Sequence, residues 1–144
     1  EVIARSTGID AGYSLRSASG KDLDRLRIEI TTDAGQHTIV GRINDEGLPT
    51  VLAIDGYRMQ MVPEGNMVIV LNDDQPGVIG QVGVTFGRLK INIADFTLSR
   101  RDNRALMVFK IDEPAPEGTV DQLRQEGSPI RFAATAQLPP LTKP

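Results

Sequence analysis

The chain has 144 residues and a formal net charge of −3 at pH 7; 40% of its residues are apolar and only 4% are aromatic. That length fits one typical domain or two small ones with a buried core. The negative net charge gives nucleic acid and anionic lipid no reason to bind. Cysteine is absent, which excludes disulfides and thiolate metal sites. No stretch reaches the roughly 18 apolar residues of a membrane span.

The opening of the chain is polar and irregular up to about residue 25. The first residues, "EVIARSTGIDAG", read like the end of a helix that is closed by Gly8. We therefore expect this sequence to be a piece of a longer protein.

The first half of the chain has the pattern of an antiparallel sheet. In "LRIEITTD" the apolar residues Leu26, Ile28 and Ile30 alternate with polar ones, which is typical of a half-buried strand. A tight turn at "DAGQ" and another at Asp55-Gly56 separate strands in the manner of hairpins. The four expected strands cover residues 26–33, 37–43, 50–54 and a stretch that begins at Tyr57.

The second half follows a turn-rich seam at "VPEGN" and has a different order of elements. Its pattern predicts strands over 66–72, 92–100, 105–111 and 129–138, a helix over 76–89 and a short helix over 120–125. This β-α-β-β-α-β order is that of the split βαβ, or ferredoxin-like, unit. We predict an α+β fold with a small antiparallel-sheet segment over residues 1–64 and the ferredoxin-like domain over residues 65–144.

Both predicted helices carry recognisable start signals. Pro76 fits the first helical position, where its missing N–H costs nothing. Thr119 and Gln122 have the spacing of a capping box. The sequence therefore predicts that the helices begin at these residues.

The first helix has an apolar stripe and a separate glycine face. The stripe contains Val78, Val82, Phe86 and Leu89, with Ile79 beside them. The glycines Gly80, Gly83 and Gly87 share one face, and each costs a helix roughly 1 kcal/mol relative to alanine. Such a face allows close approach of the sheet beneath, a second helix or a small ligand. Close packing is the simpler interpretation.

Polar residues gather around the start of this helix. Asp73 and Asp74 precede it, and a carboxylate is favourable near a helix N-terminus. This preference accounts for one of the two aspartates and leaves the other without an explanation. Asn72 ends the preceding strand, and Asn92 stands before the next one, where a left-handed turn is an alternative explanation. A carboxylate, amides and exposed helix N–H groups together are what a zwitterionic amino acid requires.

Two stretches of the sequence resemble a known family. "LNDDQPGVIGQVGVTFGRLKINIADFTLSRR" followed by "ALMVFKID" resembles an ACT domain, a small ligand-binding regulatory module, over Gly65 to about Gln137. "VIARSTGI" and "HTIVGRINDEGLPTVLAIDGYRMQMVPEGNMVIV" resemble the segment that precedes the ACT domain in the long form of D-3-phosphoglycerate dehydrogenase. That segment is an intervening, allosteric substrate-binding domain, of which residues 1–64 would be the later part. "GRIN" stands where this family more often has a Gly-Thr-Leu-Phe-like run.

The resemblance implies a regulatory function for this chain. In ACT domains of that family L-serine binds between two subunits, so a homo-oligomer through the ACT domains is expected. By motif position, Asn72 and Asp74 of one chain and Asn92 of the other would form the site, with Asp74 on the serine ammonium. The parent enzyme would oxidise 3-phosphoglycerate with NAD in the cytoplasm, for serine biosynthesis. This part would hold no active site and no cofactor.

The sequence has no recognisable catalytic constellation. The single histidine, His37, lies in a predicted strand and has no second His or Cys with which to share a metal. "RDNR" at 101–104 is predicted to be a solvated hairpin tip, and nothing in the sequence brings Arg42, Arg58 and Arg131 together. Two alternatives to the serine sensor remain. One is an ACT-type dimerisation module without a ligand, and the other is the regulatory part of another amino-acid enzyme, such as an iron–sulfur serine dehydratase.

Overall fold

The structure is a computed structural model that describes residues 24–33 and 35–141. The expected helix end at the opening of the chain lies outside these residues. So does all but the last part of the irregular stretch that precedes the first strand.

Four strands form a first antiparallel sheet with the order β1-β2-β3-β4, as the sequence predicts. They are β1 (Arg25–Thr32), β2 (Gly35–Ile43), β3 (Pro49–Ile54) and β4 (Tyr57–Met61). The half-burial expected for β1 is not found, because every residue of this strand is exposed, including Leu26, Ile28 and Ile30. The alternating pattern therefore identified the strand, but no part of the described chain covers its apolar face.

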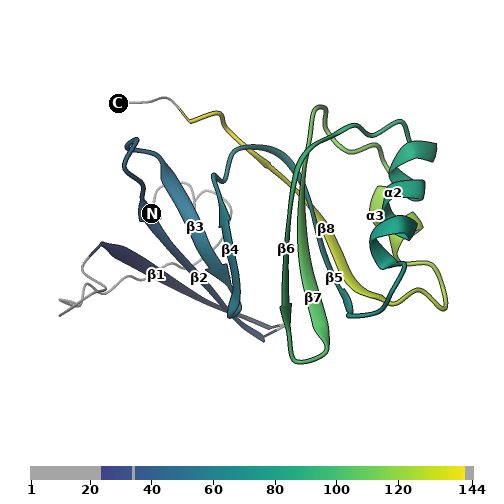
Figure 1. The fold of residues 1–144 in the computed structure, drawn as a ribbon, viewed down its shortest axis with the longest axis horizontal. Coiled ribbons are helices and arrows are strands. Elements are labelled where there is room, and N and C mark those ends of the chain that lie inside the picture. The colour runs from purple at the N-terminus through teal and green to yellow at the C-terminus, as the bar shows by residue number, and fades with distance from the viewer. Residues whose placement is uncertain (1–23, 34, 142–144) are drawn as a thin grey trace.

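The remaining elements form the predicted ferredoxin-like unit. They are β5 (Gly65–Asp73), α2 (Val78–Arg88), β6 (Ile93–Arg101), β7 (Arg104–Ile111), α3 (Thr119–Leu123) and β8 (Ile130–Leu138). The strand order β6-β7-β5-β8 makes β6 and β8 the edges of this second sheet. The two helices cover one face of it and the first sheet lies on the other, so the molecule has three layers (Figure 1).

Two hydrophobic cores lie on opposite faces of the second sheet. Between the sheet and the helices the most deeply buried side chains include Val68, Val70, Val82, Phe86 and Phe109. Between the two sheets a smaller core contains Met59, Met67, Leu106 and Val108. Strand β5 contributes to both cores, which is why its sequence is almost continuously apolar.

Helix α2 differs from its prediction at its start. Gly77, with φ 89°, is the residue before the helix, so Pro76 lies outside it rather than at the first helical position. The buried stripe of Val78, Val82 and Phe86 is confirmed, whereas Ile79 is 47% exposed.

The glycine face of α2 does not pack against any described part of the chain. A Cβ atom built on Gly80, Gly83 or Gly87 would meet no atom within 4 Å. Close packing within the chain is therefore the wrong explanation for these glycines, and the face is open.

Helix α3 also starts differently from the prediction. The residue before it is Gly118, with φ 80°, and no side chain caps the helix. The Thr119 hydroxyl instead donates to the Pro116 carbonyl at 2.7 Å, so the predicted capping box with Gln122 is wrong. No helix of the described residues is long and apolar enough to cross a membrane.

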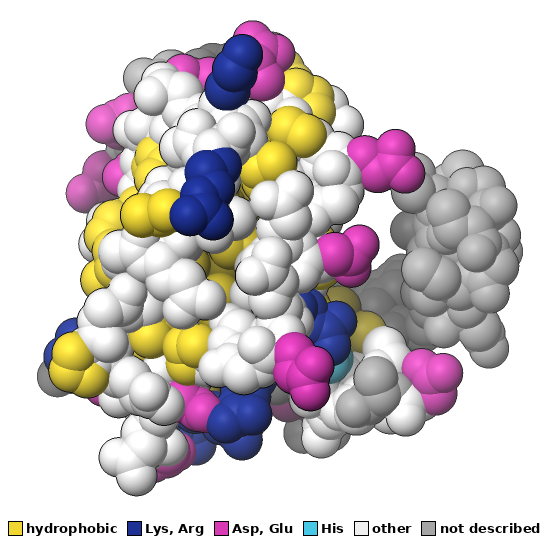
Figure 2. All heavy atoms as spheres, turned by 90° about the vertical axis from the view of Figure 1, so that its right-hand side faces the viewer, with side chains coloured by type: hydrophobic (Ala, Val, Ile, Leu, Met, Phe, Trp, Pro, Cys, Tyr) yellow, Lys and Arg dark blue, Asp and Glu magenta, His cyan; other side chains and the backbone are white. Residues whose placement is uncertain are grey.

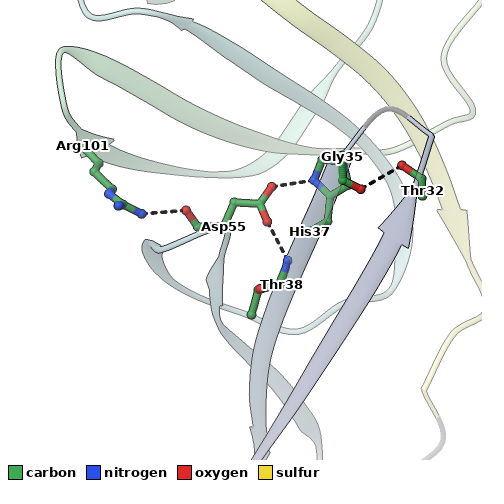
Figure 3. A network of polar contacts seen from close by, with 6 residues as sticks. All are labelled: Thr32, Gly35, His37, Thr38, Asp55 and Arg101. Atoms are coloured by element: carbon green, nitrogen blue, oxygen red, sulfur yellow. Dashed lines mark hydrogen bonds and ion pairs between the residues drawn. The ribbon is translucent and has the colours of Figure 1, made fainter. Parts of the chain in front are cut away.

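The turn at Asp55-Gly56 joins the first sheet to the second (Figure 3). Both residues have positive φ, 48° and 80°, which is the conformation of a two-residue hairpin turn. The Asp55 carbonyl accepts a hydrogen bond from Arg101 Nη1 at 3.0 Å. The Asp55 carboxylate is bonded to the Thr38 N–H at 2.7 Å and to His37 Nδ1 at 2.9 Å. His37 thus lies in a strand, as expected, and its ring has a structural partner in Asp55.

Opposite faces of α2 should respond oppositely to substitution. Gly83→Ala should stabilise the isolated chain by roughly 1 kcal/mol, because the new methyl group meets no atom and alanine favours the helix. Phe86→Ala should destabilise it by about 3–5 kcal/mol, because the buried ring packs edge-on against Phe109, with 5.1 Å between the two ring centroids. Urea unfolding of both variants measures these changes. A destabilised Gly83→Ala chain under monomeric conditions would contradict the open glycine face.

Candidate functional site

Strand β5 ends in Asn72 and Asp73 and is followed by Asp74, and these three polar residues have different surroundings. Asn72 is 2% exposed and lies on the helix-covered face of the sheet, in register with Ile130 on β8 and Ala105 on β7. Its Nδ2 donates to the Asp73 carbonyl at 2.6 Å, while its Oδ1 is buried without a hydrogen-bond partner among the described residues. An unsatisfied buried acceptor costs about 1–3 kcal/mol, so this atom requires an explanation.

Asp73 is held by the neighbouring edge strand. Its carboxylate accepts hydrogen bonds from Arg131 Nε at 2.8 Å and from Arg131 Nη2. These bonds hold the pKa of Asp73 below its ordinary value, and the charge of Arg104 acts in the same direction. The Asp73 N–H donates to the Pro129 carbonyl at 2.9 Å. Asp73 is therefore a structural link between β5 and β8.

Asp74 contacts the β6–β7 hairpin. Its Oδ1 lies 3.3 Å from Arg100 Nε, and its N–H donates to the Asn103 carbonyl at 2.9 Å. The side chain of Asp74 is 32% exposed and that of Arg100 is 66% exposed. Neither Asp73 nor Asp74 lies in the first turn of α2, and no side chain caps this helix.

The strand register places Arg100 on the same face as Asn72. Ala105 of β7 pairs with Asn72 on one side and with Arg100 on the other, so the three residues form a row across the sheet. Arg100 is absent from the residues that the sequence pointed to. Arg100 follows Leu98 by two residues on β6, which indicates that both lie on the same face of the sheet. The pairing through β7 that aligns Arg100 with Asn72 cannot be read from the chain order.

Asn92 lies at the opposite end of the second sheet. Its Nδ2 donates to Asp112 Oδ2 at 2.5 Å, and its carbonyl accepts from the Asp112 N–H at 3.2 Å. The left-handed turn conformation belongs to Lys90, with φ 57°, so a turn requirement does not explain Asn92. A shallow depression of about 240 Å³ is found here, lined by Lys90, Ile91, Asn92, Asp112, Glu113, Pro114 and Pro116.

The chain therefore brings together two of the three predicted site residues. Asn72 and Asp74 are neighbours at the end of β5, whereas Asn92 lies beside the strand's start, where Asn66 Nδ2 donates to the Asp112 carbonyl at 3.3 Å. Six residues of strand, about 20 Å, separate the two ends. A single copy cannot place one small molecule against both.

The other residues considered from the sequence do not form a site. Arg42 pairs with Asp24 at 3.5 Å in the first sheet, and Arg131 is held by Asp73 in the second. Arg58 lies on β4, and the three arginines share no common position. Within the described part of the chain, no group of three His, Asp or Glu is arranged to hold a metal ion.

Comparison with protein families identifies the second half of the chain. Residues 66–128 match the family model of the ACT domain. This stretch is an ACT domain. The match covers β5 through α3, and it therefore contains Asn72, Asp74, Asn92 and Arg100.

Curated relatives extend the similarity beyond the ACT domain. The D-3-phosphoglycerate dehydrogenase of Methanocaldococcus jannaschii is 30% identical over 126 residues, which are 86% of this chain and 24% of that protein. The enzyme of the same name from Synechocystis is 29% identical over 127 residues, 87% of this chain and 22% of that protein. That of Archaeoglobus fulgidus is 39% identical over 82 residues, 54% and 16% of the two chains. The chain is homologous to C-terminal regions of these dehydrogenases and spans less than a quarter of their length.

The Asp73–Arg131 pair makes a prediction about pH. Arg131→Gln should raise the pKa of Asp73 toward the ordinary value of about 3.9, because the guanidinium donors are lost. The native pKa is depressed, so the stabilisation by this pair is present above the unfolded-state pKa and is lost as the pH falls through the folded-state pKa. NMR titration of the Asp73 carboxyl carbon measures both values. Arg88→Gln on α2 is the control and should leave Asp73 unchanged; an equally low pKa in Arg131→Gln would refute the assignment.

Proposed function

We propose that this chain is the regulatory end of a D-3-phosphoglycerate dehydrogenase and that it binds L-serine, or another small amino acid, between two ACT domains. The observation that carries the proposal is the end of β5. There a buried amide oxygen of Asn72 has no partner among the described residues, beside an aspartate, Asp74, that does not cap the helix. An amide and a carboxylate at the start of a helix are suited to the polar groups of an amino acid.

The proposal requires a second copy of the chain, and β6 offers the surface for it. This strand is an edge of the sheet, and its Ile93 and Phe96 are each 40% exposed. An uncovered edge strand with apolar side chains favours pairing with another strand. Helix α2 adds a second uncovered surface, its open glycine face together with Val84, which is 55% exposed. Figure 2 views this helix-covered side, where apolar side chains reach the surface between uncharged atoms.

A two-fold axis at β6 would complete the site. If two β6 strands pair antiparallel around Thr97, the start of one strand lies beside the end of the other. Asn92 of one chain then comes close to Arg100 and Asp74 of its copy, which are linked at 3.3 Å. Such pairing removes the separation between the two halves of the predicted site.

The names of the relatives suggest how binding is used. In a parent dehydrogenase, a ligand held between two ACT domains would bias the arrangement of the subunits, by as much as its affinity differs between the two arrangements. Feedback by L-serine on the oxidation of 3-phosphoglycerate with NAD is the proposed outcome. The dehydrogenase active site would lie outside this segment.

Titration with L-serine tests the site. Asp74→Ala should weaken L-serine binding by about 10- to 150-fold, because a charge-assisted hydrogen bond contributes roughly 1.5–3 kcal/mol. Asn92→Ala should cost less, on the order of 1 kcal/mol, because a neutral amide makes ordinary hydrogen bonds. Isothermal titration calorimetry well below the melting temperature measures both. Unchanged affinity in Asp74→Ala means that the site assignment is wrong.

Mixing the two variants tests whether the site is shared. If Asp74 and Asn92 meet across the interface, a heterodimer of Asp74→Ala and Asn92→Ala chains has one intact and one doubly damaged site. About half of the sites in the heterodimer should then bind with wild-type affinity. If both residues act within one chain, no intact site is regenerated.

The oligomeric state is a separate prediction. The chain should sediment as a dimer, and charge placed on the β6 edge by Phe96→Lys should shift it toward monomer, because a buried lysine disfavours the interface. Phe132→Lys on the other edge strand, β8, is the control for the added charge, since Phe132 is similarly exposed at 48%. Because Phe96 also stacks on Phe109, circular dichroism melting verifies that Phe96→Lys is folded. A wild-type chain that remains monomeric at high micromolar concentration in sedimentation would contradict the dimer. A dimer without any amino-acid binding would instead support a dimerisation module.

A further inference from the structure

One residue of the ACT domain makes a contact that the proposed site does not yet use. The Nε atom of Arg100, near the end of β6, lies 3.3 Å from Asp74 Oδ1. By contrast, Arg131 holds the adjacent Asp73 through two nitrogens. The Asp74–Arg100 pair is thus the looser of the two ion pairs. It brings the guanidinium of Arg100 next to Asp74, the residue proposed to bind the ammonium group of the ligand.

We propose that Arg100 binds the carboxylate of the effector, and that the Asp74–Arg100 pair opens to take in a zwitterionic α-amino acid. This inference rests on the proposed function and adds to it the residue that selects the ligand class. In the bound state Asp74 faces the ammonium and Arg100 faces the carboxylate, so each charge exchanges one partner of opposite sign for another.

The fold places Arg100 suitably for this role. It stands in a row with Ala105 and Asn72 on the helix-covered face of the sheet. The residue that pairs with both Arg100 and Asn72 is Ala105, which has a small side chain and is 2% exposed. Asp74 is also bonded to the β6–β7 hairpin that carries Arg100, because its N–H donates to the Asn103 carbonyl. This corner therefore offers a cation and an anion, and the same row of residues contains a buried amide oxygen without a partner among the described residues.

The cost of opening the pair is small and the gain is specific. Exposed ion pairs contribute little to stability, and the Arg100 side chain is 66% exposed. A guanidinium presents donors in a planar fork that matches a carboxylate, which an ammonium group does not. Asp74 alone would select amines and Arg100 alone would select carboxylic acids. Together they select molecules that carry both charges close to each other.

Two other arginines nearby are bonded elsewhere, whereas Arg104 lies opposite Asp73 on β7 and lowers the pKa of Asp73 by its charge. Arg131 is bonded to Asp73, and Arg101 donates to Asp102 Oδ2 at 2.9 Å and to the Asp55 carbonyl at 3.0 Å. Replacing either of them would alter a contact within the chain rather than the corner at Asp74. This makes Arg131→Gln a suitable control for Arg100→Gln, because both remove an arginine from an aspartate at the end of β5.

The experiment compares L-serine with two analogues by calorimetry. L-Serinamide lacks the carboxylate charge and glycerate lacks the ammonium. The wild-type chain should prefer L-serine to both. Arg100→Gln should weaken L-serine binding by about 10- to 150-fold, the effect of losing one charge-assisted hydrogen bond. It should leave L-serinamide binding nearly unchanged, so that the preference between the two collapses. Arg100→Lys should restore part of the preference, and Arg131→Gln should retain all of it.

The outcomes separate this inference from the function on which it rests. If Arg100→Gln keeps both the affinity for L-serine and the preference over L-serinamide, Arg100 is not the carboxylate-binding residue, while the serine site stands. If the wild-type chain binds neither L-serine nor any other amino acid, the proposed function falls and the role of Arg100 falls with it. Circular dichroism melting of each variant verifies that it is folded at the titration temperature.

Discussion

The rest of the structure depends on the burial of β5 on both of its faces. Val68 and Val70 have no exposed surface and face the helices, while Met67 is 4% exposed and faces the first sheet. The strand is also paired along both edges, with β7 and with β8. Displacing it would open both cores and break two ladders of hydrogen bonds. Its last residues are therefore held in place by the whole domain.

That rigidity allows a polar group to be buried in an unfavourable position. A flexible segment would turn the Asn72 amide toward water and recover the hydrogen bond that Oδ1 lacks. Because Asn72 is still within the ladder, paired with Ala105 and Ile130, its backbone cannot make this movement. A buried polar group without a hydrogen bond is costly, and it persists only where the surrounding structure holds it in that position. In the proposed site, a donor group of the ligand would supply the hydrogen bond that Asn72 Oδ1 lacks.

The two aspartates that follow illustrate how the same side chain takes different roles in neighbouring positions. Asp73 is bonded to Arg131 through two donors, and its lowered pKa reflects that bonding. Asp74 has one longer contact with Arg100. The first arrangement fastens the edge strand β8 to the centre of the sheet. The second leaves a carboxylate and a guanidinium that can each accept another partner.

The β6–β7 hairpin lies between this corner and the first sheet. Asn103 at its tip accepts a hydrogen bond from the Asp74 N–H, and Arg101 donates to the carbonyl of Asp55. Gly56 permits that approach, because a Cβ atom there would lie 2.0 Å from Arg101 Nη1. Positive φ values at Asp102 and Asn103 form the tight turn that brings both contacts to one place. The solvated tip expected from "RDNR" is thus also a junction between the two sheets.

The sequence by itself determined the strands, the helices and their order, because period-two and period-3.6 apolar patterns depend only on local geometry. It also pointed to Asn72, Asp74 and Asn92 through short motifs. Only the tertiary structure decided which aspartate is fastened, since Arg131 lies 58 residues from Asp73 in the chain. It alone aligned Arg100 with Asn72, because register between strands is a long-range property. It also showed that the glycine face of α2 is open and that Asn92 lies at the far end of the sheet. These features depend on contacts between distant residues, and local patterns contain no information about them.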